Sequence, residues 1–178
     1  MRLLRSTVHP SITDLSASSF NRKATRAIVI NGEDILLLFT DRYNDYSLPG
    51  GGIDHGESHI EGLIRELQEE TGAQNIRNIK PFGLYEEFRP WYKEDYDIVH
   101  MESFCYQCDI DEKLLAPSLE SYEISNGMRP IWINIHQAIA HNELTMAKSD
   151  KKGLSIERET FLLKRIVEEL VVETTIVD

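Results

Sequence analysis

The segment Gly51–Ala73, GGIDHGESHIEGLIRELQEETGA, runs from a glycine-rich loop into a predicted helix that carries several carboxylates. Glu66, Glu69 and Glu70 lie close together near the end of that helix. Like charges at helical spacing repel one another, so such a cluster is costly to fold unless a cation neutralises it. Hard divalent ions such as Mg²⁺ and Mn²⁺ take oxygen ligands. The segment therefore indicates a metal site suited to phosphate chemistry.

The same segment resembles the Nudix box, G-x5-E-x7-R-E-U-x-E-E-x-G-U, in which U is an apolar residue. Every fixed position of the box is filled, by Gly51, Glu57, Arg65, Glu66, Leu67, Glu69, Glu70, Gly72 and Ala73. The resemblance implies a Nudix hydrolase, a metal-dependent enzyme that cleaves a nucleoside diphosphate linked to another group. It also implies the Nudix fold, a mixed β-sheet between helices, with the box forming a loop, a helix and a second loop.

The composition predicts one soluble globular domain. The chain has 178 residues, of which 41% are hydrophobic and 28% charged, and it is long enough to bury a sizeable core. We expect a single domain over residues 23–178, preceded by an arm or a short extra element at residues 1–22. No apolar run approaches the ~20 residues of a membrane span, and the N-terminus has no apolar stretch typical of a signal peptide. The expected location is cytoplasmic, with no membrane partner.

The net charge of −11 bears on the choice of partner. Neutralising the phosphates of a nucleic-acid polymer takes surplus Lys and Arg, so the charge argues against such a partner. It does not argue against a small anionic nucleotide, because bound metal ions reverse the local field.

The order of apolar runs predicts an α/β or α+β fold. Strands are expected at Ala24–Ile30, Ile35–Thr40, Tyr46–Leu48, Ile76–Phe88, Ile98–Ile110 and Met128–Ile135. Helices are expected at Ser58–Thr71, His136–His141 and Ser155–Val172. Asn31-Gly32 between the first two strands is a strong hairpin signal.

The box helix has recognisable ends. Ser58 followed by Glu61 is a capping-box pattern, and Gly72 lies where helices commonly end in a left-handed turn. Gly62 costs roughly 1 kcal/mol against Ala inside a helix, so we expect it to pack closely against a strand.

Cys105 and Cys108 form a CxxC pattern within a predicted strand. The alternative of a redox or zinc half-site lacks a second cysteine pair. Ordinary thiols are therefore the favoured interpretation, and their odd separation would point them to opposite faces of the strand.

The site roles follow from helical spacing and from the resemblance. Glu66 and Glu70 are four residues apart, so both can reach one Mg²⁺ or Mn²⁺ ion, while Glu69 can hold a second ion or a bridging water. The family pattern implies the same three carboxylates and adds a backbone carbonyl at Gly50 or Gly51. Arg65 is expected to orient carboxylates and Glu57 to support it from the loop.

A general base outside the box is expected at Glu123, with Glu120 or a box glutamate as alternatives. Candidate substrate-binding residues are the loop aromatics and a nearby cation: Tyr46, Arg89, Trp91 and Tyr92. Exposed loop aromatics often mark binding. Packing in the core or against a second subunit of a homodimer is the alternative for each aromatic.

Three rival interpretations remain open. Acidic helices are most often solvated faces, although the glycine loop and the complete box oppose that interpretation here. A Nudix-type isomerase of isopentenyl diphosphate would need a catalytic cysteine in a specific setting. A Nudix-like regulator that binds a nucleotide without cleaving it would typically have a broken box and a DNA-binding domain.

Overall fold

The computed structural model describes residues 1–150 and 152–171. Its strands are β1 (Leu3–Val8), β2 (Ser19–Ile28), β3 (Ile30–Asn31), β4 (Asp34–Thr40), β5 (Asp45–Ser47), β6 (Arg77–Pro90), β7 (Ile98–Asp109) and β8 (Met128–Asn134). Its helices are α1 (His59–Thr71), α2 (Ser121–Ser125), α3 (Ile135–Lys148), α4 (Ile156–Ile166) and the π-helix η1 (Val167–Val171). The predicted mixture of strands and helices is confirmed.

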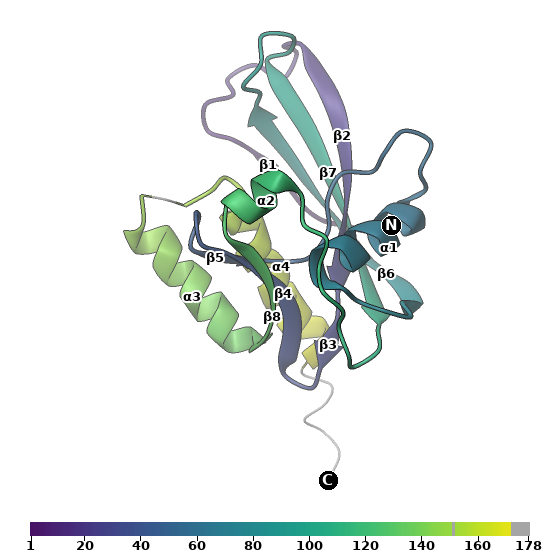
Figure 1. Cartoon of the computed structure of the whole chain (residues 1–178). Coiled ribbons are helices and arrows are strands. Elements are labelled where there is room, and N and C mark those ends of the chain that lie inside the picture. Colours follow the sequence, from purple (N-terminus) through teal and green to yellow (C-terminus); the bar gives the residue numbers. More distant parts are fainter. Residues whose placement is uncertain (151, 172–178) are drawn as a thin grey trace.

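The strands divide into two sheets (Figure 1). The first sheet has the order β1-β6-β7-β2, and it is mixed, because β6 and β7 are antiparallel while β1 and β2 join in parallel. The second sheet is antiparallel, with β4 paired to β3, β5 and β8. One hydrophobic cluster joins both sheets to α3 and α4, and another joins them to α1. The expected arrangement of mixed sheet and helices is present, with the strands divided between two sheets.

The first strands of the chain, β1 to β4, differ in detail from the expected strands. The predicted strand Ala24–Ile30 is split, because β2 belongs to the first sheet and β3 to the second. The predicted hairpin at Asn31-Gly32 is present between β3 and β4, with Gly32 at φ 63°. Residues 3–8 form β1, and the expected division after residue 22 falls inside β2.

The box helix begins and ends as predicted. Ser58 Oγ accepts a hydrogen bond from the Glu61 N–H, and Glu61 Oε2 accepts one from the Ser58 N–H. Gly72 caps the other end at φ 72°, in the left-handed region. Gly62 does not pack on a strand, because a Cβ there would lie 3.0 Å from the Glu57 carboxylate. The glycine is thus needed for the approach of the box loop.

The later helices differ more from expectation. α2 has no counterpart in the sequence analysis, and α3 is longer than the predicted His136–His141. α4 and η1 cover most of the predicted Ser155–Val172, whose last residue lies outside the described residues. Ile156, Leu162 and Ile166 are buried, while Phe161 and Leu170 are only partly buried. Among the described residues, no helix combines the length and apolar character that crossing a membrane requires.

Both cysteines are free and buried on opposite sides of β7. Cys105 belongs to the cluster with α4 and Cys108 to the cluster with α1, as their odd separation predicted. Burial raises the pKa of each thiol to about 12, so both stay protonated. They are packing residues, and neither suits a redox pair or the cysteine of an isomerase.

Candidate active site

The glycine loop between β5 and α1 is held by side chains from three elements. The Leu48 N–H donates to Glu159 Oε2 (2.9 Å) from α4, and the Gly50 N–H donates to Glu70 Oε2 (2.6 Å) from α1. The Arg26 guanidinium of β2 donates to the Gly50 carbonyl. The loop is therefore fixed on both sides before any ligand binds.

Two glycines of this loop are required by close approach. Gly50 has φ 135°, and a Cβ there would collide with the Thr25 carbonyl of β2. A Cβ on Gly51 would lie 2.7 Å from the Glu66 carboxylate. The missing side chain at Gly51 thus lets a carboxylate of α1 come against the loop backbone.

Arg65 is the centre of a carboxylate network beside the loop. Its Nε and Nη2 donate to Glu57 at 2.8 and 3.0 Å, and its Nη1 donates to Glu66 at 2.8 Å. Nη2 also donates to the Gly52 carbonyl, and Nη1 lies 3.4 Å from Glu69. These hydrogen bonds lower the pKa of Glu57. The contacts match those expected of an orienting arginine with Glu57 as its loop partner.

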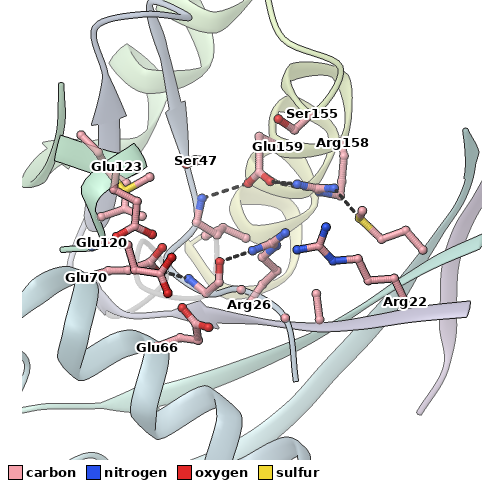
Figure 2. A pocket seen from close by; sticks show the side chains of 18 of the residues that line it. Arg22, Arg26, Ser47, Glu66, Glu70, Glu120, Glu123, Ser155, Arg158 and Glu159 are labelled. Carbon is pink, nitrogen blue, oxygen red and sulfur yellow. Dashed lines mark hydrogen bonds and ion pairs between the residues drawn. The ribbon is translucent and has the colours of Figure 1, made fainter. Parts of the chain in front are cut away.

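A cavity of about 290 Å³ opens beside the glycine loop. Figure 2 shows most of its carboxylates on one side and, on the other, guanidinium groups with the Glu159 carboxylate among them. The acidic side carries Glu66, Glu70, Glu120 and Glu123. The basic side carries Arg22, Arg26 and Arg158. Arg26 Nε is buried and has no hydrogen-bond partner among the described residues. Such a pair of walls suits a metal–phosphate ligand.

The pKa values of Glu66 and Glu70 on the acidic side of the cavity are both raised. Burial raises the pKa of Glu70 well above its usual value, with the nearby Glu66 and Glu123 adding to the shift and the Gly50 N–H opposing it. Burial also raises the pKa of Glu66, against the influence of Arg65. A hard divalent cation binds such carboxylate oxygens, and it would stabilise the ionised forms that burial disfavours. Within the described ranges, no three His, Cys, Asp or Glu side chains are already gathered around one point.

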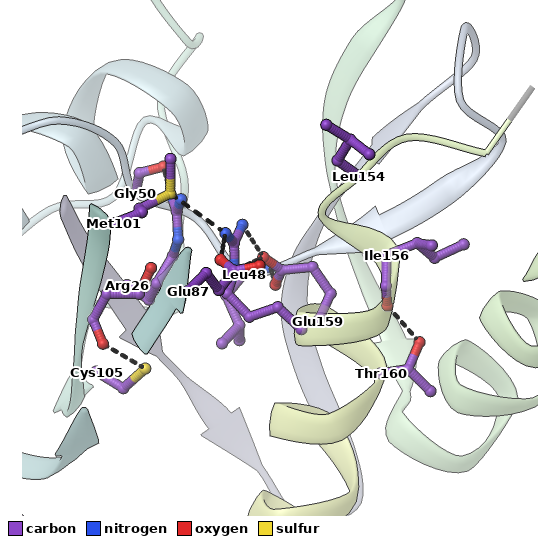
Figure 3. A network of polar contacts seen from close by, with 12 residues as sticks. Arg26, Leu48, Gly50, Glu87, Met101, Cys105, Leu154, Ile156, Glu159 and Thr160 are labelled. Atoms are coloured by element: carbon purple, nitrogen blue, oxygen red, sulfur yellow. Dashed lines mark hydrogen bonds and ion pairs between the residues drawn. The ribbon is translucent and has the colours of Figure 1, made fainter. Parts of the chain in front are cut away.

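A buried ion network supports the loop from α4 (Figure 3). Arg158 donates to Glu87 Oε2 (2.7 Å) and to Glu159 Oε1 (2.7 Å), and Arg89 donates to Glu87 Oε1. Arg158, Glu87 and Glu159 are almost fully buried. Glu159 in turn accepts the Leu48 N–H, so the network connects the first sheet to the glycine loop.

The two candidates for a carboxylate outside the box both line the cavity. Glu123 is only 5% exposed, and its oxygens accept from the Glu120 N–H (2.7 Å) and the Tyr122 hydroxyl (3.1 Å). Glu120 is exposed. The geometry therefore fixes the orientation of Glu123, which forms a capping box with Glu120 at the start of α2.

The structure brings some predicted site residues together and leaves others outside. Those that line the cavity are Gly51, Glu66, Glu70, Arg89 and Glu123. Glu57 and Arg65 stand behind them, and the Glu69 side chain is 46% exposed outside the cavity. Tyr46 packs against Phe39 and His141 under α3, which corrects its assignment to the substrate.

Trp91 and Tyr92 also lie outside the cavity, at the end of the β6–β7 hairpin. The sequence analysis missed the basic wall of Arg22, Arg26 and Arg158, together with Glu159. Alternation along β2 places Arg22, Ala24 and Arg26 on one face. The predicted strand began only at Ala24, and nothing in the sequence shows what that face meets.

Comparisons with known proteins agree with this geometry. The family model for the NUDIX domain matches residues 20–155, so the chain belongs to the Nudix family. An RNA pyrophosphohydrolase from Bartonella quintana is 40% identical over 57 residues, which cover 32% of this chain and 30% of that protein. Cleavage and polyadenylation specificity factor subunit 5 from Dictyostelium discoideum is 24% identical over 151 residues, 79% of this chain and 75% of that protein.

Among solved structures, a mutator MutT protein from Bacillus halodurans is similar, with a TM-score of 0.53 at 26% identity over 73% of this chain and 77% of that chain. The predicted Nudix fold is thereby confirmed. The chain spans less than a third of the length of the Bartonella relative.

Proposed function

We propose that this chain is a divalent-metal-dependent hydrolase that cleaves the pyrophosphate linkage of a nucleoside diphosphate derivative. The observation that supports it best is the cavity beside the glycine loop, in which the box glutamates Glu66 and Glu70 lie opposite Arg22 and Arg26. Nucleoside triphosphates, ADP-ribose and nucleotide sugars all contain the linkage. The similarity to RNA pyrophosphohydrolases agrees with this class of reaction.

Mg²⁺ or Mn²⁺ would be held by Glu66 and Glu70, with a backbone carbonyl at Gly50 or Gly51, and Glu69 would serve a second ion. When bound, the metal supplies charge stabilisation for the phosphate oxygens and lowers the pKa of a coordinated water.

The remaining roles belong to the chain itself. Arg22 and Arg26 would bind phosphate oxygens through charge-assisted hydrogen bonds, which a planar guanidinium makes well. Arg26 lines the cavity, and its guanidinium also donates to the Gly50 carbonyl. Glu123 would accept a proton from the attacking water, and its two hydrogen bonds hold it in place for this. Arg65 and Glu57 would keep Glu66 oriented.

A panel of phosphate-release assays tests the proposal. It should span nucleoside triphosphates, ADP-ribose, nucleotide sugars, dinucleoside polyphosphates and RNA with a 5′-triphosphate. We expect turnover of at least one substrate with Mg²⁺ or Mn²⁺, complete loss with EDTA, and recovery when the metal is restored. Turnover that survives thorough chelation would overturn the metal dependence.

The role of the outside carboxylate is tested by Glu123→Gln. We expect kcat to fall at least ~100-fold with little change in KM, because general-base groups contribute to the transition state rather than to binding. Glu120→Gln is the matched variant from the same cavity wall, and we expect it to keep most of kcat. The reverse pattern would assign the role to Glu120, and full activity of both variants would place the base within the box.

A second candidate function is nucleotide binding without cleavage. The observation behind it is the match to the Dictyostelium protein, which is named as a specificity factor subunit and not as a hydrolase. That match covers more of this chain than the pyrophosphohydrolase match does. Nucleotide binding in a titration, with no phosphate release across the panel, would favour it. A single domain from residue 23, a homodimer and a cytoplasmic location stay predictions.

A further inference from the structure

One face of the first sheet, on which Arg22 and Arg26 of β2 lie, lines the cavity and continues beyond it. This face is called the cavity floor below. Alternate residues of a strand share one face, so Phe20 lies on the same side of β2 as Arg22 and Arg26. On β6, Glu87 contacts Arg158 and Arg89 lines the cavity. Trp91 is the next alternate residue along the chain, and its backbone N–H donates to the Asp97 carbonyl.

Contacts on the opposite face of the sheet support placing Phe20 and Trp91 on the cavity side. His100 of β7 stacks on Phe88 of β6 with ring centroids 4.3 Å apart, and its Nδ1 lies 3.1 Å from Asn21 Oδ1. These three residues are sequence neighbours of the floor residues and lie on the other side of the sheet. Phe20 and Trp91 are therefore on the cavity side.

Aromatic rings gather where this floor ends. The Phe20 ring lies 4.8 Å from Trp91 and 5.0 Å from Tyr96, and Trp91 lies 4.3 Å from Tyr92, between ring centroids. Tyr96 is 41% exposed and Tyr92 is 78% exposed. Trp91 Nε1 donates to Asp95 (3.1 Å), which satisfies the polar edge of the indole. This aromatic cluster therefore contacts a ligand through its ring faces, because the indole N–H of Trp91 is already hydrogen-bonded.

We propose that Phe20, Trp91 and Tyr96 form a stacking surface for a nucleobase of the substrate whose phosphates bind at Arg22 and Arg26. The inference rests on the proposed function, because that function places the phosphates. Phe20 lies two residues before Arg22, about 7 Å away along the strand, so one ligand can contact both. The loop also carries Glu94 and Asp95, while Lys93 Nζ lies 5.8 Å from the Trp91 ring centroid and 5.7 Å from that of Tyr92. With two carboxylates beside one ammonium group, this end of the surface favours a neutral base over a second phosphate group.

A fluorescence titration tests the stacking directly. The chain has two tryptophans, so Trp132→Phe leaves Trp91 as the only reporter. With Ca²⁺ present, we expect quenching of Trp91 by a nucleoside triphosphate or by an oligoribonucleotide with a 5′-triphosphate, and none by tripolyphosphate. Quenching by the mononucleotide assigns the surface to the first base, and quenching by the oligonucleotide alone assigns it to a following base.

Equal quenching by tripolyphosphate, or none by any probe that binds, would overturn the proposal. Because the titration measures binding, it gives its answer whether or not the protein hydrolyses the probe.

Kinetics of the best substrate provide the second test. We expect Trp91→Leu to raise KM roughly tenfold with kcat nearly unchanged, because stacking on an aromatic contributes to binding. Trp91→Phe, which keeps a ring, should restore most of the affinity. Phe88→Leu removes an aromatic from the reverse face of the same strand, and its KM should equal that of the original protein. An unchanged KM for Trp91→Leu together with a changed oligomeric state would show instead that the surface joins two copies of the chain.

Discussion

Glu66→Gln is expected to lower kcat at least ~100-fold, which corresponds to about 2.7 kcal/mol of transition-state stabilisation. Glu66 lines the cavity, lies against Gly51 and is oriented by Arg65. The amide keeps the shape of the side chain and removes the negative charge that a metal ion would need. Folding should be little affected, since burial already disfavours the charged form of Glu66.

The measurement is kcat over a range of Mg²⁺ concentrations. Glu61→Gln is the matched control, because it removes a charge from the same helix while a glutamine still completes a capping box. We expect it to retain activity. If Glu66→Gln works as well as Glu61→Gln, Glu66 does not hold the metal. Glu69→Gln, whose side chain is outside the cavity, then tests whether a second ion reaches the exposed end of the cluster.

Arg158→Met is expected to lower the free energy of unfolding by about 3–5 kcal/mol, the usual cost of removing one partner from a buried ion pair. The substitution leaves Glu87 and Glu159 buried, with only Arg89 and the Leu48 N–H as remaining partners. Urea denaturation measures the loss. The deficit should shrink as the pH falls from 8 to 5, because buried carboxylates without their cation take up protons more readily.

The control for this variant lies on the same helix. Arg165 is partly exposed and pairs with Glu168 and Glu169, so Arg165→Met should cost less than ~1 kcal/mol. An equal, small cost for both variants would show that the buried network contributes little to stability. The network would then serve only to position the glycine loop.

The box itself was readable from the sequence because its signals are local. The capping box at Ser58, the left-handed turn at Gly72 and the helical spacing of Glu66 and Glu70 each depend on residues only a few positions apart. Helix geometry fixes such relations without reference to the rest of the chain. The opposite faces of Cys105 and Cys108 follow in the same way from strand alternation.

The division into two sheets could not be predicted from the sequence, because the apolar residues Ile28, Val29 and Ile30 run without interruption across the break between β2 and β3. Which strand each part joins depends on partners far along the chain, β7 for β2 and β4 for β3. Tyr46 shows the same limit. Its position just before the glycine loop favoured a substrate contact, but α3 covers it.

The sequence by itself therefore determined the family resemblance, the helix with its carboxylates, and the glycine loop that meets them. Only the tertiary structure decided what faces those carboxylates. Arg22 and Arg26 come from β2 and Arg158 from α4, so the basic wall exists only after the sheet and the last helix pack together. Arg158 and Glu159 are buried because they pair with each other and with Glu87, and the sequence does not show that pairing.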